Sequence, residues 1–188
     1  DFGVSSILYK LSPGTITPAG EKSLILPDVL EQEQGVESAI YIEDRYDVNS
    51  RLSLSAGLRF STYSFLGPKT INNYTAGFPI EKIYLDGTTE YGKGKNIRSY
   101  QGPEYRISGR YRLTDNTSVK ASYNTTRQYI HLLSNTMVMS PTDIWKLSDP
   151  YIKPQLGSQW AVGFYRNLRG NKLELSVEAY YKTIQHFL

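Results

Sequence analysis

The chain has 188 residues, with 16 Tyr, no Cys and a formal net charge of +3. The absence of Cys excludes a disulfide framework, a thiolate zinc site and a cysteine nucleophile. Lys and Arg are spread along the chain instead of forming one block, which argues against a nucleic-acid-binding protein. The longest apolar run, residues 39–42, is far shorter than the ~18 residues of a membrane-spanning helix, so a spanning segment here would have to be a strand.

Alternation of apolar and polar residues is the dominant pattern. It predicts strands, because a helix with a period of ~3.6 residues would spread the same residues around its circumference. The first two segments are strand-like but carry apolar residues at both parities, for example Val4 and Ile7, so the side that they turn to lipid stays open. Later segments alternate cleanly. The expected antiparallel strands lie near residues 1–10, 35–48, 51–64, 103–114, 117–130, 155–168 and 172–185.

The same alternation predicts two chemically different faces, one apolar and lipid-facing and the other charged and inward-facing. The side chains expected to face lipid are those of Leu52, Leu54, Leu58, Val119, Ala121, Leu173, Leu175 and Val177. The side chains expected to face inward are those of Arg59, Arg110, Lys120, Glu174 and Glu178. Glu43 and Asp44 are adjacent and therefore point to opposite faces, so they cannot form a catalytic carboxylate pair. We expect one of them to pair with an inward-facing arginine such as Arg59.

The connections between the predicted strands alternate strictly between short and long. The short ones, residues 48–50, 114–116 and 169–171, contain Asn, Asp or Gly, which tolerate the positive φ of tight hairpins. The long ones, at about residues 11–34, 65–102 and 131–154, hold most of the prolines. Because short and long connections alternate, all long loops lie at one end of the sheet. This is typical of outer-membrane barrels, which have short periplasmic turns and long extracellular loops.

Aromatic residues gather near the predicted strand ends. The group consists of Tyr46, Phe60, Tyr63, Phe65, Tyr129, Tyr165, Tyr180 and Tyr181. These positions are typical of the aromatic girdles at the two bilayer interfaces, where a ring lies in the apolar region and its hydroxyl group stays wet. The ordinary preference of aromatic residues for strands is the competing explanation.

Two hairpins resemble those of TonB-dependent receptors. The first has an aliphatic–Tyr–aliphatic–Glu–Asp strand at residues 40–44, a tight turn, and then Gly-Leu-Arg at residues 57–59. The second enters after Pro154 and leaves through Glu-x-Tyr-Tyr-Lys at residues 178–182. The opening Phe-Gly at residues 2–3 and the Pro-Gly at residues 13–14 resemble versions of the family found in nutrient-scavenging surface systems. The resemblance covers most strands but no long loop.

The resemblance implies a barrel of about 22 strands that is filled by an N-terminal plug and energised by TonB across the periplasm. Seven strands are too few for a single-chain bacterial barrel. We therefore expect an all-β fold, an antiparallel transmembrane β-barrel segment of about seven strands with short periplasmic turns and long extracellular loops. Residues 1–188 would be a partial TonB-dependent receptor β-barrel without the plug domain and the remaining strands.

In function, the resemblance implies part of an active transporter in the bacterial outer membrane, not an enzyme and without a cofactor. It would take up a scarce nutrient such as a siderophore, cobalamin, a glycan or a peptide. The implied partners are outer-membrane lipid, the TonB complex through an N-terminal region absent from this chain, the ligand, and a surface lipoprotein, but no nucleic acid. The alternative is a soluble β-sandwich acting as a carbohydrate-binding or adhesive module, because a soluble antiparallel sheet alternates in the same way.

Five aromatic residues in the long loops are candidate ligand contacts: Tyr74, Phe78, Tyr84, Tyr91 and Trp145. Aromatic side chains on loops offer a large contact area at a low entropic cost. The alternative is that these residues pack the loops onto one another. His131 and His186 lie far apart in the chain and without the spacing of metal ligands, so we expect no metal site. We also expect no catalytic residues.

Overall fold

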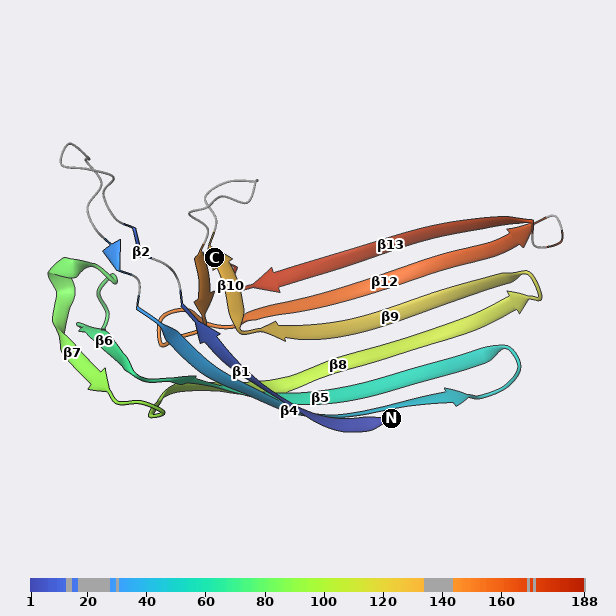
Figure 1. Cartoon of the computed structure of the whole chain (residues 1–188). Helices are drawn as coiled ribbons and strands as arrows, with labels where there is room; N and C mark the ends of the chain where they lie inside the picture. The colour runs from blue at the N-terminus through green and yellow to red at the C-terminus, as the bar shows by residue number, and fades with distance from the viewer. Residues whose placement is uncertain are drawn as a thin grey trace.

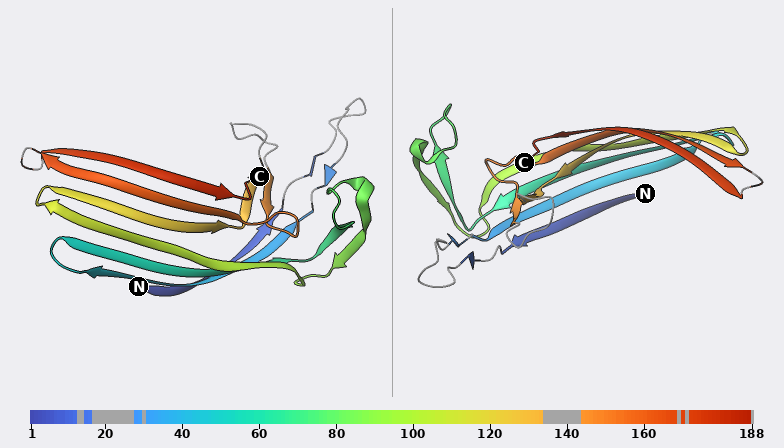
Figure 2. Two further views of the ribbon diagram at one scale, coloured as in Figure 1. Left: turned by 180° about the vertical axis from the view of Figure 1, so that it is seen from behind. Right: turned by 90° about the horizontal axis from the view of Figure 1, so that it is seen from above.

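Seven long strands form one curved antiparallel sheet in the computed structural model, which describes residues 1–12, 15–16, 28–29, 31–133, 144–168, 170 and 172–187 (Figures 1 and 2). The strands are β1 (Phe2–Leu11), β4 (Glu33–Asp47), β5 (Leu52–Leu66), β8 (Asn96–Thr114), β9 (Thr117–Gln128), β12 (Gln155–Leu168) and β13 (Leu173–Gln185). Their order in the sheet is their order along the chain, so each long strand is hydrogen-bonded to the next.

The predicted strand map is confirmed, with one clear difference at β8. This strand begins at Asn96 instead of residue 103, and Pro103 lies inside it opposite Phe60 of β5. A proline is tolerated in a strand where its missing N–H is not needed by a neighbouring strand. β8 pairs with β9 only from Arg106 onward, so no β9 partner stands opposite Pro103.

The long connections contain hairpins of their own instead of irregular loop alone. The second holds β6 (Lys69–Tyr74), the 3₁₀ helix η1 (Lys82–Tyr84) and β7 (Leu85–Tyr91), and the third holds β10 (Ile130–Leu133) and β11 (Ile144–Leu147). In the first, the structure describes the short strands β2 (Thr15–Ile16) and β3 (Asp28–Val29). Figure 1 shows these elements at one end of the sheet and the tight turns at the other. The predicted separation of long and short connections is confirmed.

Two of the tight turns are stabilised in different ways, one by a side-chain hydrogen bond and one by a glycine with a positive φ. Asn49 accepts hydrogen bonds from the backbone N–H groups of Arg51 and Leu52 through its side-chain oxygen, at 2.8 and 2.9 Å. Gly170 has a φ of 63°. Within the described residues of the three turns, no Asn or Asp has a positive φ, so the expected positive φ is correct for Gly170 and wrong for the others. Asn171 lies outside the described residues.

The register of the ladders confirms the two predicted faces. Directly paired residues share a face, and the pairs Leu54–Gly109, Ala121–Val162 and Val162–Ala179 carry the apolar face across the sheet. Pairing also shows which side of the first two strands, β1 and β4, faces lipid. Val4 lies opposite Ile40 on the apolar face, whereas Ile7 lies opposite Glu37 on the polar face. All thirteen side chains assigned to a face from sequence lie on the predicted side.

The polar face is the concave one. A hollow of about 570 Å³ lies over it and is lined by residues of β4, β5, β8, β9, β12 and β13, which is possible only where the sheet curves around the hollow. Trp160 and Val162 on the convex face are each 60% exposed. A β-sandwich would cover such a face with a second sheet. Among the described residues the seven long strands form one sheet, which favours the barrel segment over the sandwich.

Candidate functional site

The convex face carries an apolar belt of the length that a membrane requires. On β13 the belt runs from Leu173 to Tyr181, which matches the ~9–11 residues of a tilted transmembrane strand. Its boundary toward the long connections is a row of aromatic side chains on successive strands. These are Phe60, Tyr105, Tyr123, Trp160 and Tyr181. Two residues closer to the long connections, on the same face, lie side chains with hydroxyl groups, such as those of Ser158 and its hydrogen-bonded neighbour Thr183.

The aromatic girdle predicted from sequence is only partly correct. Phe60, Tyr181 and Tyr46 lie on the convex face, as a girdle requires. Tyr165 and Tyr180 lie on the polar face. The three others, Tyr63, Phe65 and Tyr129, are buried and do not face lipid. Proximity to a strand end in sequence does not reveal the parity of a residue, and parity decides its face.

A partly buried arginine joins three strands on the concave face. Arg59 of β5 donates to Glu37 of β4 at 2.7 Å and also pairs with Glu104 of β8, which stands directly opposite it. The Tyr9 hydroxyl group donates to the second oxygen of Glu37 at 2.8 Å. Because both carboxylates are nearly buried, each needs this counter-charge. The predicted pairing of Arg59 with Glu43 or Asp44 is therefore wrong.

The geometry of Glu43 and Asp44 explains that error. Glu43 lies opposite Gly57, and its side chain covers this glycine at 3.3 Å from the position of a Cβ. Asp44 has the opposite parity and faces away from Arg59. Arg59 instead contacts Glu104, which stands directly opposite it, and Glu37, which lies nearer the end of the sheet that carries the long connections. The two neighbouring carboxylates were correctly predicted to point to opposite faces.

Further toward the tight turns, the hollow is lined by charged side chains of both signs. Arg110 and Lys120 are direct cross-strand neighbours, and Glu178 lies on β13. Tyr165 donates its hydroxyl proton to Glu178, and the Lys120 ammonium group lies 4.5 Å from the Tyr165 ring centroid. The like charges of Arg110 and Lys120 repel one another, and this repulsion is tolerated where water fills the hollow and hydrates both groups. The arrangement suits the lining of an aqueous lumen.

At the end of the sheet that carries the long connections, part of the third long connection covers the concave face. Tyr63 and Tyr129 stack with ring centroids 4.8 Å apart and form a small buried core with Phe65 and Leu147. Gly35 makes room for Tyr63, since a Cβ at residue 35 would lie 2.7 Å from the tyrosine oxygen. The Tyr129 and Ser61 hydroxyl groups are hydrogen-bonded at 2.9 Å. Leu147 comes from the third long connection, which therefore folds back onto the wall.

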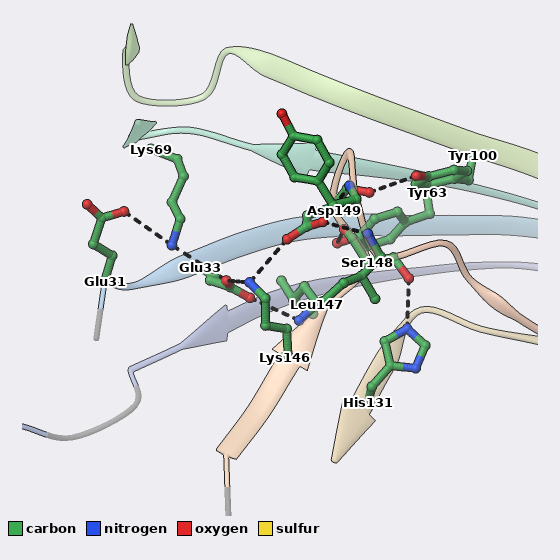
Figure 3. A network of polar contacts seen from close by, with 12 residues as sticks. Glu31, Glu33, Tyr63, Lys69, Tyr100, His131, Lys146, Leu147, Ser148 and Asp149 are labelled. Atoms are coloured by element: carbon green, nitrogen blue, oxygen red, sulfur yellow. Dashed lines mark hydrogen bonds and ion pairs between the residues drawn. The ribbon is translucent and has the colours of Figure 1, made fainter. Parts of the chain in front are cut away.

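Residues 144–152, which we call the strap, are anchored by one buried carboxylate (Figure 3). Glu33 is 5% exposed, pairs with the Lys146 ammonium group, and accepts the backbone N–H of Leu147 at 2.9 Å. Lys146 also contacts Asp149 at 3.1 Å. The hydroxyl group of Tyr63 donates to the Ser148 carbonyl oxygen at 3.0 Å. The strap is thus fixed to β4 and β5 by its side chains and its backbone.

Two titratable groups of the strap region have shifted pKa values with clear causes. Burial alone would lower the pKa of Lys146, but its contacts with Glu33 and Asp149 outweigh burial and raise it, so the charge persists. Burial lowers the pKa of His131, against a smaller opposing effect of the Asp149 charge. His131 is 2% exposed, and its Nε2 lies 2.9 Å from the Ser148 hydroxyl oxygen. The buried imidazole is therefore held neutral.

The five candidate ligand contacts all lie at the end with the long connections, but the structure does not bring them into one cluster. Phe78 and Tyr84 stack on one another at 4.9 Å, and Tyr74 packs edge-on against Tyr151 at 5.6 Å. Tyr91 lies at the base of the β6–β7 hairpin opposite Lys69. Trp145 is 48% exposed on β11. Packing within the loops accounts for part of this set and leaves Trp145 with a large free surface.

Sequence reasoning missed the residues that organise this end: Glu33, Lys146, Asp149 and the Tyr63–Tyr129 pair. One local signal was available. Asp149 precedes a proline and accepts the backbone N–H groups of Tyr151 and Ile152 at 2.8 Å each, which is a common use of Asp in turns. The pairing of Glu33 with Lys146 had no such signal, because these residues are brought together only by the folding back of the strap.

Over the described ranges, no group of three or more His, Asp or Glu side chains is arranged to hold a metal ion. His186 contacts the Pro154 carbonyl oxygen at 3.0 Å, far along the chain from the buried His131. In the part of the chain that the structure describes, no helix has the length and apolar character to cross a membrane.

Comparison with known proteins gives one match. The family model described as "TonB dependent receptor-like, beta-barrel" matches residues 8–188, which is nearly the whole chain. No curated protein and no solved structure matches the chain. The matched range includes all of the long strands from β4 to β13 and the last four residues of β1.

Proposed function

Because the chain belongs to the TonB-dependent receptor-like β-barrel family, an outer-membrane family of transporters, we propose that its seven strands form part of the wall of an importer for a scarce nutrient. The observation that carries the proposal is the division of the sheet. An apolar belt of membrane length covers the convex face, and charges line the concave face. A wall between lipid and an aqueous lumen needs both.

The difference between the two ends of the sheet supports an orientation of the wall in the membrane. In barrels of the outer membrane, tight turns lie on the periplasmic side and long loops on the outside. The β6–β7 and β10–β11 hairpins would then meet the ligand first. A siderophore, cobalamin, a glycan or a peptide is the proposed cargo class, and a surface lipoprotein is a proposed partner at this outer end. No covalent chemistry is required of the wall.

The edges of the sheet support the proposal that further strands complete the barrel. Within the described residues, β1 and β13 each pair on one side only. In lipid, unpaired N–H and C=O groups cost several kcal/mol each. We propose that neighbouring strands of the same barrel satisfy these edges, and that a plug domain contacts the charged lining around Arg110 and Glu178. TonB would act through that plug.

A labelling experiment tests the orientation directly, because this chain has no Cys of its own. One variant carries Ile83→Cys in η1, where Ile83 is 80% exposed, and the other carries Asn116→Cys in the tight turn after β8. A thiol reagent too large for the outer membrane should label only the first variant in intact cells. After permeabilisation it should label both. Labelling of Asn116→Cys in intact cells, or recovery of the protein in the aqueous fraction without detergent, would contradict the proposal.

The ligand contacts are tested by uptake measured with a panel of iron chelates, cobalamin, oligosaccharides and peptides. Trp145→Ala and Tyr84→Ala should raise the apparent KM for the transported class without lowering the maximal rate, because they remove contact area and leave the wall intact. Ile83→Ala, next to Tyr84, is the matched control and should behave as the unmodified protein. Unchanged KM in both aromatic variants would show that these rings only pack the loops.

A further inference from the structure

The strap contacts the β6–β7 hairpin as well as the wall. The Tyr151 ring packs edge-on against Tyr74 with ring centroids 5.6 Å apart, and its hydroxyl group donates to the Asn72 carbonyl oxygen. Partial burial raises the pKa of the Tyr151 hydroxyl group, and the neighbouring Tyr74 and Tyr91 add to this rise. Tyr74 and Tyr91 are two of the five candidate ligand contacts. The strap therefore places a tyrosine of its own against the hairpin surface that carries them.

A chain of alternating charges couples the strap to the same hairpin (Figure 3). It runs through Glu31, Lys69, Glu33, Lys146 and Asp149. Lys69 is the first residue of β6, and its ammonium group lies 3.5 Å from the Glu33 oxygen that also contacts Lys146. Without Lys69, the nearly buried carboxylates of Glu33 and Asp149 would share the Lys146 ammonium group, which is unfavourable at a site with little water. A displacement of the hairpin or of the strap therefore weakens the position of the other.

Tyr151 makes the contacts that a ring of a ligand would make on this hairpin. One is the edge-on contact with the Tyr74 ring, which is a favoured arrangement of two aromatic rings. The other is the hydrogen bond from the hydroxyl group to the Asn72 carbonyl oxygen. Neither contact requires that the ring belong to the strap. A hydroxyl-bearing ring on another molecule can make both, but only after it displaces Tyr151, which is 41% exposed and therefore within reach of solvent.

We propose that the hairpin surface formed by Tyr74 and the Asn72 carbonyl group binds a hydroxyl-bearing ring of the cargo, either a sugar or a phenol, and that Tyr151 is an internal competitor for this site. The proposal rests on the proposed function, because it places capture of the cargo at the outer end of the wall. A competitor lowers the apparent affinity, since only the fraction of the protein with a free site binds cargo. Cargo that displaces Tyr151 also loosens the strap, which covers the stacked Tyr63–Tyr129 pair. Capture at the hairpin thus uncovers aromatic surface on the inner wall.

The binding test uses the complete transporter purified from outer membranes and three probes: the ferric complex of catechol as the phenol, maltoheptaose as the sugar, and trialanine, which has no ring. Tyr151→Ala should tighten binding of the phenol or the sugar about 3- to 30-fold, because the site no longer has to be vacated. Tyr151→Phe, which loses only the hydrogen bond to Asn72, should tighten it less, and Tyr74→Ala should weaken it. Ile83→Ala, at an exposed position of the same hairpin, is the matched control and should leave binding unchanged.

Hydrogen exchange of the Leu147 amide measures the strap without any probe. Tyr151→Ala and Lys69→Met should each speed this exchange about 5- to 50-fold, because each removes a contact that couples the strap to the hairpin. Lys82→Met, at an exposed lysine of η1, is the matched control and should leave the rate unchanged. In the unmodified protein, a saturating amount of the bound probe should also speed the exchange. Folding of each variant is checked by the heat-dependent gel shift of the barrel.

The sign of the Tyr151 effect separates a competitor from an ordinary contact. A side chain that touches the cargo loses affinity when it is truncated, whereas a competitor gains it for the cargo. Unchanged or weaker binding in a folded Tyr151→Ala protein, binding of trialanine as tight as that of the ring-bearing probes, or unchanged exchange in both coupling variants would each overturn the proposal. Recovery of the protein without detergent, or binding of none of the probes, would instead overturn the proposed function, and the proposal with it.

Discussion

A pair of adjacent arginine substitutions tests the two-faced wall most sharply. Leu54 lies on the convex face, where its side chain covers Gly109 of β8, and it is two residues from the middle of the belt on β5. Ser55 lies on the concave face with its hydroxyl group 3.5 Å from Glu43. Leu54→Arg places a charge in lipid, whereas Ser55→Arg places it in a hollow beside a carboxylate.

The expected magnitudes differ widely. An arginine on the lipid face costs about 2–4 kcal/mol near the midplane and less toward the interfaces. Leu54 lies ~7 Å along the strand from the centre of the belt, so the cost should fall within this range. That corresponds to about a 30- to 1000-fold change in the folded-to-unfolded ratio. Ser55→Arg should cost less than ~1 kcal/mol, because the exposed pair that it forms with Glu43 contributes little either way.

The measurement is the midpoint of urea unfolding for the transporter in lipid vesicles, with the fraction folded read from its heat-dependent gel mobility. The two variants differ by one position in sequence, so local strand propensity and chain length are matched. Equal destabilisation by the two substitutions, or a larger loss for Ser55→Arg, would refute the assignment of lipid to the convex face.

Three further predictions concern the polar contacts of the wall and the strap. Arg59→Met should destabilise the folded protein by about 3–5 kcal/mol in the same unfolding assay, because it leaves two nearly buried carboxylates without their counter-charge; Arg110→Met, in the open hollow, should cost less than ~1 kcal/mol. Glu33→Ala should speed hydrogen exchange of the Leu147 amide about 5- to 100-fold, since the N–H loses its acceptor, and Glu33→Gln should restore most of the protection. Because burial lowers the pKa of His131, this residue binds a proton more readily when the strap is undocked, so docking should be complete above pH ~6.5 and weaken as the pH falls toward the lowered pKa. Protection of the Leu147 amide, corrected for the intrinsic exchange rate at each pH, should therefore fall between pH 7 and 5; protection that stays flat, or that matches a His131→Gln variant, would contradict this.

The strands and their faces could be predicted because a period of two is a local property. In β13, Leu173, Leu175 and Val177 alternate with Glu174 and Glu178, and only one assignment puts the charges away from lipid. In β1 this reasoning failed, since Val4 faces lipid while Ile7 covers the concave face, and both positions accept an apolar side chain. The faces of β1 follow only from its register against β4.

The partners of charged residues were beyond prediction for a different reason. Arg59 has a carboxylate neighbour on each flanking strand, and which of them it contacts depends on register and on the direction in which its side chain leans. The sequence offered Glu43 as the nearest acidic residue across the turn, but that side chain is occupied over Gly57. The Glu33–Lys146 pair spans more than a hundred residues and follows from the path of the strap alone.

The brevity of the apolar runs has a consequence for export. A segment of ~18 or more apolar residues leaves the secretion channel sideways and stays in the inner membrane as a helix. Here the longest run is residues 39–42, because every lipid-facing residue of β4 and β5 is followed by one that faces the lumen. The alternation thus hides the membrane-binding surface from the first bilayer that the extended chain crosses. That surface becomes continuous only when the strands pair. Insertion is therefore confined to the second bilayer, the outer membrane.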